Sequence, residues 1–204
     1  MVRRGTAARI ALSTAIVAMT TGLGACAGRG EPDQPDRFTS TPSACQLVGP
    51  QKASQLTGSL RGKPRTPPTE TRDTCQWPAP PAPARGRNAP RPAAPARSLS
   101  LVVTMRNAPV GQDDIRGTDL ASQDFAKQRK HDRAGKAASV RGVGDEAYGR
   151  FSDHDGHAVI RDGNVTVTLN YTAPAPRGPN PAAQRAMRTQ LVNAAKEVAG
   201  NLEK

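Results

Sequence analysis

The strongest periodic pattern in the sequence lies near the C-terminus, where apolar residues recur every three or four positions. This spacing places them on one face of an α-helix. The series comprises Met187, Leu191, Ala194 or Ala195, Val198 and Leu202. Asn180-Pro181 stands ahead of it, and this pair suits the N-cap and the first position of a helix. The pattern predicts an amphipathic helix that closes the chain.

Upstream of that helix, apolar and polar residues alternate in the way that is typical of strands with one buried face. The alternation covers Ser98–Met105 and Val165–Tyr171. Asp162-Gly163-Asn164 is a strong hairpin-turn signal, and it connects Val165–Tyr171 to a predicted strand at Ala158–Arg161. Residues 142–151 combine a glycine-containing turn with a further strand. We therefore predict three consecutive strands joined by short connections.

Two further helices are predicted from weaker patterns. Apolar residues between positions 47 and 56 have helical spacing, with Pro50 suited to the first turn and Gly58 to the end. Residues 118–132 carry a narrow apolar stripe among many charged residues, which indicates a second helix.

A proline-rich segment separates the two strands of the first predicted hairpin. We expect a basic loop at residues 61–72, then a short strand at Cys75–Trp77 that pairs with Ser98–Met105. Between them, residues 78–97 hold seven Pro, four Arg and no acidic residue. Because proline cannot donate a ladder hydrogen bond, we interpret this segment as an extended insertion in the hairpin.

The order of predicted elements is helix, two strands, helix, three strands, helix. Strands joined by turns favour antiparallel pairing, and a sheet with one apolar face needs helices to cover it. The predicted fold class is therefore α+β. We expect an antiparallel sheet of about five strands, packed on one face by two or three helices, in a single domain at residues 43–204.

The first 25 residues have the layout of an export signal. Arg3, Arg4 and Arg9 give a basic start, and an uncharged apolar run follows from Ile10 to Leu23. Its 14 residues are fewer than the ~20 that a membrane-spanning helix needs and match a signal-peptide core. The ending Leu23-Gly24-Ala25-Cys26 resembles the bacterial lipobox, in which the cysteine thiol receives a diacylglyceryl group and becomes the new N-terminus. A plain secretory signal followed by an incidental cysteine is the alternative.

Lipidation of Cys26 would hold the mature chain on the outer face of a bacterial cytoplasmic membrane. Two or three acyl chains, palmitate among them, give a firm anchor at ~0.8 kcal/mol per buried methylene. Residues 26–42 are polar and rich in Gly and Pro, so we expect a disordered tether between the membrane lipid and the domain. The pair Arg3-Arg4 leaves twin-arginine export open beside the general secretory route.

The remaining cysteines agree with export. Once Cys26 is lipidated, Cys45 and Cys75 form an even pair in an oxidising compartment. A disulfide between them would close a loop of about 30 residues and stabilise the fold by roughly 3–4 kcal/mol on the chain-entropy model. We expect Trp77, two positions after Cys75, to pack on the same face of the strand.

The domain resembles a family of small actinobacterial lipoproteins that carry a conserved extracytoplasmic domain of unknown function. The resemblance rests on Cys45 with Leu47-Val48, on Cys75-Gln76-Trp77, on the turn from Gly142 to Ala147, on the hairpin and on the closing helix. The insertion at residues 78–97 departs from the compact members. The resemblance implies an α+β domain with one disulfide and no established catalytic residues.

The mature chain is strongly basic. Removal of residues 1–25, which contain three arginines and no acid, lowers the formal net charge from +12 to +9. We predict no nucleic-acid partner, because that polymer is absent outside the membrane and aromatic residues for stacking make up only 3% of the chain. The basic loops, with Arg61, Lys63, Arg65 and Arg85–Arg97, suit anionic lipid or an acidic wall polymer. Loops without any partner are the alternative.

The densest group of chemically competent side chains is Asp153-His154-Asp155-Gly156-His157. Imidazole and carboxylate groups suit zinc and similar ions, but Asp and Gly between two strands are also ordinary turn residues, and we favour the turn. Gly142-Val143-Gly144-Asp145 lacks the Lys-Ser/Thr ending of a phosphate loop, and no Gly-x-Ser-x-Gly motif occurs. We therefore predict no enzyme activity, no metal and no cofactor.

The sequence thus favours a lipid-anchored cell-envelope binding or accessory module without catalytic activity. The alternative is an envelope hydrolase or metal-dependent enzyme that uses His154 and His157. A concave pocket in which His131, His154 and His157 converge would favour the enzyme, and scattered exposed histidines would favour the module. Structural attachment to a wall polymer is a third class, and it rests on the basic loops alone.

The lipobox assignment predicts the fate of a Cys26→Ala variant. Without the thiol no thioether can form, so the precursor should not be lipidated or cut by the lipoprotein peptidase. Globomycin, which inhibits that peptidase, should cause lipidated wild-type precursor to accumulate, as seen by immunoblotting of membrane fractions. Normal maturation and membrane retention of Cys26→Ala would refute the assignment.

Overall fold

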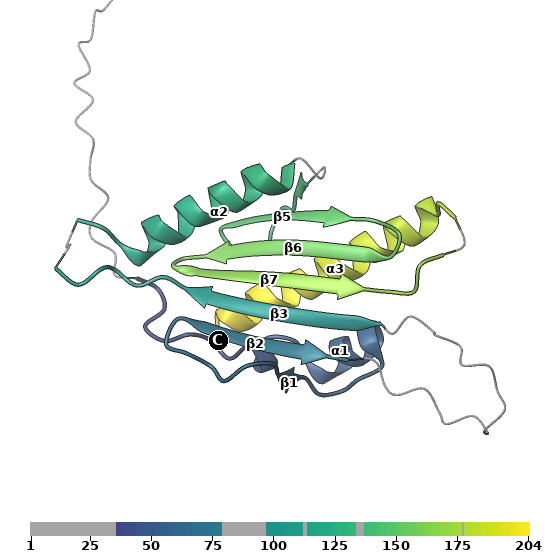
Figure 1. Ribbon diagram of the computed structural model, residues 1–204, viewed down its shortest axis with the longest axis horizontal. Helices are drawn as coiled ribbons and strands as arrows, with labels where there is room; N and C mark the ends of the chain where they lie inside the picture. The colour runs from purple at the N-terminus through teal and green to yellow at the C-terminus, as the bar shows by residue number, and fades with distance from the viewer. Residues whose placement is uncertain (1–35, 79–96, 112–113, 134–136, 177) are drawn as a thin grey trace, which may run out of the picture. The chain divides into compact units, whose positions relative to one another are not determined.

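The computed structural model describes residues 36–78, 97–111, 114–133, 137–176 and 178–204, which form an α+β fold (Figure 1). Within these residues an antiparallel sheet of seven strands is accompanied by three α-helices and one short 3-10 helix. In chain order the elements are η1 (Ala44–Gln46), α1 (Pro50–Thr57), β1 (Lys63–Pro64), β2 (Arg72–Trp77), β3 (Ser98–Met105), α2 (Gly117–Arg133), β4 (Ala138–Ser139), β5 (Glu146–Phe151), β6 (Asp155–Asp162), β7 (Val165–Thr172) and α3 (Pro181–Leu202).

The sheet is built around one central strand. Its order is β1-β2-β3-β7-β6-β5-β4, with every neighbouring pair antiparallel. Strand β7 pairs over all eight of its residues with β3 on one side and with β6 on the other. The turn between β6 and β7 consists of Gly163 and Asn164, and Gly163 adopts a φ of +54°, a conformation that costs glycine little.

One face of the sheet carries the main core. Alternate residues of β3 and β7 are buried there, and α3, α1 and η1 cover them. Helix α3 packs closely against Gly156 of β6, where an added Cβ atom would lie 2.8 Å from Cδ2 of Leu191. The apolar face that the sequence pattern assigned to the closing helix is buried, which confirms that prediction.

Helix α2 covers the opposite face, so the prediction that the helices pack on one face only was wrong. Phe125 of α2 packs edge-to-face on Tyr148 of β5, with ring centroids 5.2 Å apart, and Val159 of β6 completes this second cluster. The reason lies in the strands themselves. Ala158-Val159-Ile160 is apolar at three consecutive positions, so β6 has apolar side chains on both faces and needs cover on both.

The sheet has seven strands instead of the predicted number of about five. The two additional strands, β1 and β4, are only two residues long and lie at opposite edges. Lys63 and Pro64 of β1 fall in the segment predicted as a basic loop. Proline has no N–H and is tolerated at a sheet edge, but two residues are too few to show an alternating pattern.

The predicted disulfide and first hairpin are confirmed. Cys45 of η1 and Cys75 of β2 are bridged, with their Cα atoms 5.1 Å apart. Strand β2 pairs with β3 in register from Arg72↔Thr104 to Trp77↔Leu99. Cys75 and Trp77 are both 1% exposed and belong to the main core. Most of the proline-rich insertion, residues 79–96, lies outside the described residues.

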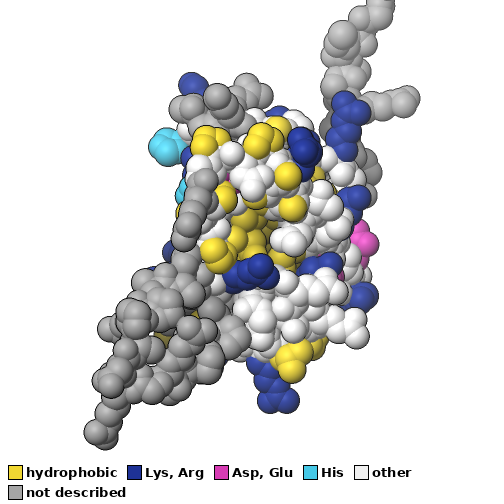
Figure 2. All heavy atoms as spheres, turned by 90° about the vertical axis from the view of Figure 1, so that its right-hand side faces the viewer, with side chains coloured by type: hydrophobic (Ala, Val, Ile, Leu, Met, Phe, Trp, Pro, Cys, Tyr) yellow, Lys and Arg dark blue, Asp and Glu magenta, His cyan; other side chains and the backbone are white. Residues whose placement is uncertain are grey.

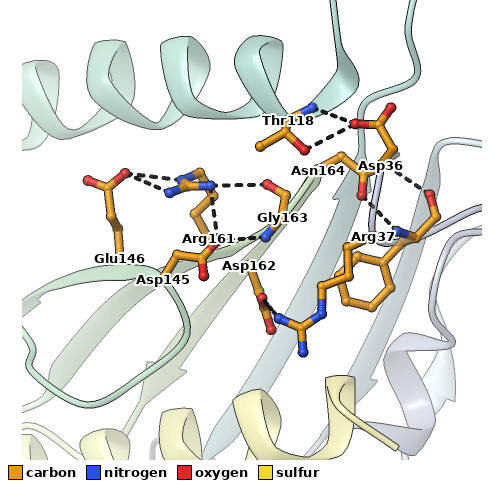
Figure 3. A network of polar contacts seen from close by, with 10 residues as sticks. Asp36, Arg37, Thr118, Asp145, Glu146, Arg161, Asp162, Gly163 and Asn164 are labelled. Carbon is orange, nitrogen blue, oxygen red and sulfur yellow. Dashed lines mark hydrogen bonds and ion pairs between the residues drawn. The ribbon is translucent and has the colours of Figure 1, made fainter. Parts of the chain in front are cut away.

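The folded domain begins earlier than residue 43. Residues 36–42 were assigned to the tether, but Asp36 accepts hydrogen bonds from the backbone N–H groups of Gly117 and Thr118 and thereby caps α2 from a distance. Asn164, which is fully buried, accepts from Phe38 N–H and donates to Phe38 O at 2.9 Å and to Arg106 O at 3.0 Å. These bonds fix the start of the domain to the β6–β7 turn (Figure 3).

The same turn carries a network of ion pairs (Figure 3). Arg161 bridges Asp145 at 3.2 Å and Glu146 at 3.0 Å. Asp162 is 1% exposed and pairs with Arg37. Burial raises the pKa of Asp162 above its ordinary 3.8, although the Arg37 guanidinium partly opposes the shift. The unfolded chain therefore releases this proton at lower pH than the folded one, and this group's contribution to stability declines as pH rises through its folded pKa.

The buried position of Asn164 predicts that Asn164→Ala destabilises the domain. The change leaves Phe38 N–H and two backbone carbonyls without their partner, and we expect a loss of about 2–3 kcal/mol in the free energy of unfolding. Urea denaturation measures it. Asn193→Ala, on an exposed position of α3, should stay within about 0.5 kcal/mol. Equal effects of the two substitutions would contradict the assigned role of Asn164.

Candidate functional site

A hollow of about 750 Å³ opens at the end of the sheet opposite the β6–β7 turn. It lies where β5 ends, β6 begins, β7 ends and α3 starts. We call it the strand-end hollow. It is lined by Ala138, residues 149–152, 154–157 and 170–172, and Gln184, Arg185 and Arg188 of α3. Figure 2 looks onto this end of the molecule and shows apolar side chains inside a hollow, with Lys or Arg side chains beside it.

The sheet register brings three lining residues of the hollow side by side. Trp77, Leu99, Tyr171, Gly156 and Phe151 stand in one cross-strand row near the end of the sheet, and the last three line the hollow. At the glycine in this row, Leu191 and Met187 of α3 pack close to the backbone of β6. On the side of α3, the Gln184 amide donates to the Phe151 carbonyl at 2.8 Å and ties the helix to the end of β5.

The charge of the hollow is mainly positive. Arg150, Arg185 and Arg188 are all exposed, and within the described part of the chain none of them forms an ion pair with an acid. The Arg188 guanidinium lies 6.0 Å from the centroid of the half-buried Phe151 ring. The first turn of α3 contains no acidic residue, so the positive end of the helix dipole adds to this charge.

The acidic residues beside the hollow are bound to His154. Its Nδ1 lies 2.7 Å from Asp153 Oδ1 and its Nε2 lies 2.9 Å from Asp155 Oδ2. The hydrogen bond to Asp153, together with the charge of Asp155, raises the pKa of His154. Asp153 also accepts a hydrogen bond from the backbone of Asn180, ahead of α3, and its pKa is lowered mainly by His154. Both carboxylates are therefore engaged by His154 and help to hold the turn between β5 and β6.

His157 follows Gly156 in β6, so its side chain lies on the opposite face of the sheet. It belongs to a different cluster. Its Nδ1 lies 2.7 Å from Asn170 Oδ1, and its Nε2 makes an ion-pair contact of 3.3 Å with Asp132 Oδ2. Asp132 also accepts a hydrogen bond of 2.7 Å from the Tyr148 hydroxyl. The cluster joins α2 to the middle strands of the sheet. Both nitrogens of His157 face protein oxygen atoms, and neither is directed at a hydroxyl nucleophile.

The pKa shifts in this cluster follow from the same contacts. Burial opposes ionisation of Asp132, but the Tyr148 hydrogen bond and the nearby His157 and His131 outweigh it and lower its pKa below 3.8. Burial first, and then the Asp132 carboxylate, raise the pKa of Tyr148. The lowered pKa means that ionised Asp132 stabilises the fold near neutral pH, and that this contribution is lost as pH falls through the folded pKa.

The three histidines do not converge on one pocket. His131 is 90% exposed with Nδ1 3.6 Å from Asp132, so it shares that carboxylate with His157, whereas His154 pairs with Asp153 and Asp155. Among the residues that the structure describes, no group of three or more His, Cys, Asp or Glu side chains is arranged to hold a metal ion. Ser152, Asp153 and His154 form the turn between β5 and β6, whereas Asp155, Gly156 and His157 belong to β6, so the predicted turn holds only for the first part of this group.

The other residues singled out from the sequence fall into two groups, those that the structure describes and those that it does not. Arg61, Lys63 and Arg65 are exposed on and beside the edge strand β1, and Arg97 is exposed at the start of β3. Cys26 and the arginines between 85 and 91 lie outside the described residues. The sequence reasoning missed the group of Arg150, Arg185 and Arg188. The spacing of Arg185 and Arg188 places both on one side of a helix, but only the sheet register brings the end of β5 beside them.

Comparison of the chain with protein-family models, curated proteins and solved structures finds no match. No helix in the described ranges is both long and apolar enough to cross a membrane.

If Asp132 and Tyr148 act as a structural pair, their substitutions should be coupled. Asp132→Ala leaves the Tyr148 hydroxyl without its acceptor, and we expect a loss of about 1–3 kcal/mol in unfolding free energy. In the Tyr148→Phe background the same substitution should cost about 1 kcal/mol less. Denaturant melts of the four proteins complete the cycle, and strictly additive effects would show that the pair contributes no coupling.

Proposed function

We propose that this protein is a lipid-anchored binding or accessory module of the cell envelope, without catalytic activity. In this proposal Cys26 holds it on the outer face of a bacterial cytoplasmic membrane, and it belongs with the small actinobacterial lipoproteins that its motifs resemble. The observation that carries the proposal is the concentration of exposed arginines at one end of the domain that have no acidic partner among the residues described.

The contrast between the two ends of the sheet supports a binding role. At the β6–β7 turn, Arg37 and Arg161 are neutralised by acids. At the strand-end hollow the arginines are left in solvent. A fold that needed these charges for its own stability would pair them, whereas unpaired cations at one end attract an anionic partner.

The charge of the proline-rich insertion also supports a binding role for this end of the domain. The insertion leaves the sheet after Trp77 and returns before Ser98, and both residues lie in strands that end beside the hollow. Arg97, at the point of return, is close enough to Tyr171 to act on the pKa of its hydroxyl, which burial raises and the arginine opposes. The insertion itself contributes three further arginines and no acid, which makes this part of the sequence strongly basic.

The Cys45–Cys75 disulfide supports an extracytoplasmic location, because such bonds persist in oxidising compartments. The lipobox supplies the anchor in this proposal, and the bilayer surface outside the cytoplasm supplies anionic headgroups. An envelope hydrolase remains the second candidate. Like a metal-dependent enzyme, it would use His154 and His157, which both line the hollow, where His154 is paired with Asp155.

The proposal predicts that the insertion contributes to membrane contact and not to folding. Residues 79–96 contain no Val, Ile, Leu or aromatic residue, so replacing them with a short Gly/Asn turn should change the melting temperature little. The same change should weaken cosedimentation of the unlipidated chain with vesicles that contain anionic lipid. Because the attraction is screened, added salt should erase the difference.

The matched control keeps the insertion and replaces Arg85, Arg87 and Arg91 with Gln. It should reproduce the weaker cosedimentation if charge is responsible, and neutral vesicles should bind none of the variants. Unchanged cosedimentation of both variants at low salt would remove the insertion from the proposal, and loss of folding would show that the insertion is a structural element.

A further inference from the structure

The strand-end hollow has the dimensions of a ligand site. Its volume of about 750 Å³ falls within the ~300–1,000 Å³ of pockets that bind small molecules. Gly156 lines the hollow and packs closely against Leu191 of α3. The Phe151 ring also lines the hollow; it is half-buried against the main core, with the Arg188 guanidinium 6.0 Å from its centroid.

The polar part of the hollow selects an anion. Arg185 and Arg188 lie three residues apart at the start of α3 and are therefore neighbours on its surface. Their guanidinium groups can each present paired donors to phosphate oxygens. The two aspartates nearby are already bound to His154, and three arginines outnumber them.

Charge also decides which occupant fits. The proline-rich insertion carries three arginines and no acid, so it cannot supply an anionic occupant. A fully polar anion would make no use of the apolar side chains inside the hollow (Figure 2). A phospholipid with a net negative charge has both parts in one molecule, since its phosphate lies next to a glycerol backbone and acyl chains.

We infer that the strand-end hollow binds one molecule of anionic phospholipid, with its phosphate between Arg185 and Arg188 and its glycerol and proximal acyl carbons against Phe151. The inference rests on the proposed function, which it makes specific. It adds a defined pocket to a surface that would otherwise act only through diffuse charge.

The test uses monomeric lipid, so that binding to a vesicle surface does not contribute. The mature chain with Cys26→Ser keeps every residue of the folded part and can be titrated calorimetrically with dihexanoyl phosphatidylglycerol below its micelle concentration. Glycerophosphoglycerol, the same headgroup without acyl chains, and dihexanoyl phosphatidylcholine, which carries no net charge, are the comparison ligands. We expect both to bind at least tenfold more weakly.

Two matched variants locate the site. Arg185→Gln with Arg188→Gln should weaken the binding of dihexanoyl phosphatidylglycerol at least tenfold. Arg61→Gln with Arg65→Gln removes the same charge from exposed positions beside β1 and should leave binding unchanged. Circular dichroism melts confirm that both variants fold. Phe151→Ser should reduce the preference for the acylated ligand over glycerophosphoglycerol.

Each contrary outcome has one meaning. Equal losses in the two arginine variants would replace the pocket by diffuse attraction. Equal affinity for glycerophosphoglycerol would point to a polymer of glycerol phosphate and overturn the lipid inference. Absence of monomer binding, with anionic vesicles still sedimenting the chain, would overturn the pocket but leave the proposed function standing. Absence of both would overturn both.

Discussion

The pairing of β7 with β3 and β6 along its whole length is the constraint on which the rest of the structure depends. Strands far apart in the sequence meet there, since β3 comes from the first hairpin and β6 from the second. A shift of one residue in either ladder would turn Val167 and Leu169 away from α3 and toward the face that α2 covers. The register therefore fixes the core and places Tyr171, Gly156 and Phe151 side by side in the lining of the hollow.

This register also separates the two ends of the domain chemically. At the end where β6 turns into β7, the buried Asn164 is hydrogen-bonded to the N-terminal segment, Asp162 pairs with Arg37 through one carboxylate oxygen, and Arg161 is paired with two acids. At the other end, Gly156 lies beside the half-buried Phe151, and the first turn of α3 contains no acidic residue. The ion pairs are thus concentrated at the first end. At the second end, the arginine side chains remain available to a binding partner.

Local signals were sufficient for most elements of the fold. The period of the closing helix, the Gly163-Asn164 turn and the alternation in Ser98–Met105 each depend on neighbours in sequence, and the structure has the corresponding elements. The two-residue edge strands were not predictable, because pairing of Lys63–Pro64 is decided by β2 and not by its own residues. The position of α2 was missed because the apolar stripe around Phe125 does not specify which face of a sheet it will cover.

The candidate site was predictable only in part, for the same reason. His154 and His157 stood out by composition, yet their surroundings differ: His154, in the turn before β6, pairs with its neighbours Asp153 and Asp155, whereas His157, within β6, contacts Asp132 of α2. The arginines of the hollow gave no sequence signal as a group. Arg150 and Arg188 are 38 positions apart, and their proximity arises from the long-range packing of α3 beside the end of β5.

The fixation of Asp36 and Phe38 to α2 and to the β6–β7 turn has a mechanical consequence. Tension applied through the chain upstream of Asp36 meets these side-chain hydrogen bonds before it reaches any strand. If they yield, the nine residues down to the Cys45–Cys75 bridge can extend by at most about 30 Å, and the covalent bridge then stops the extension at β2. The start of the domain can therefore extend by a limited length under load. The central sheet and the hollow at its far end keep their shape during that extension.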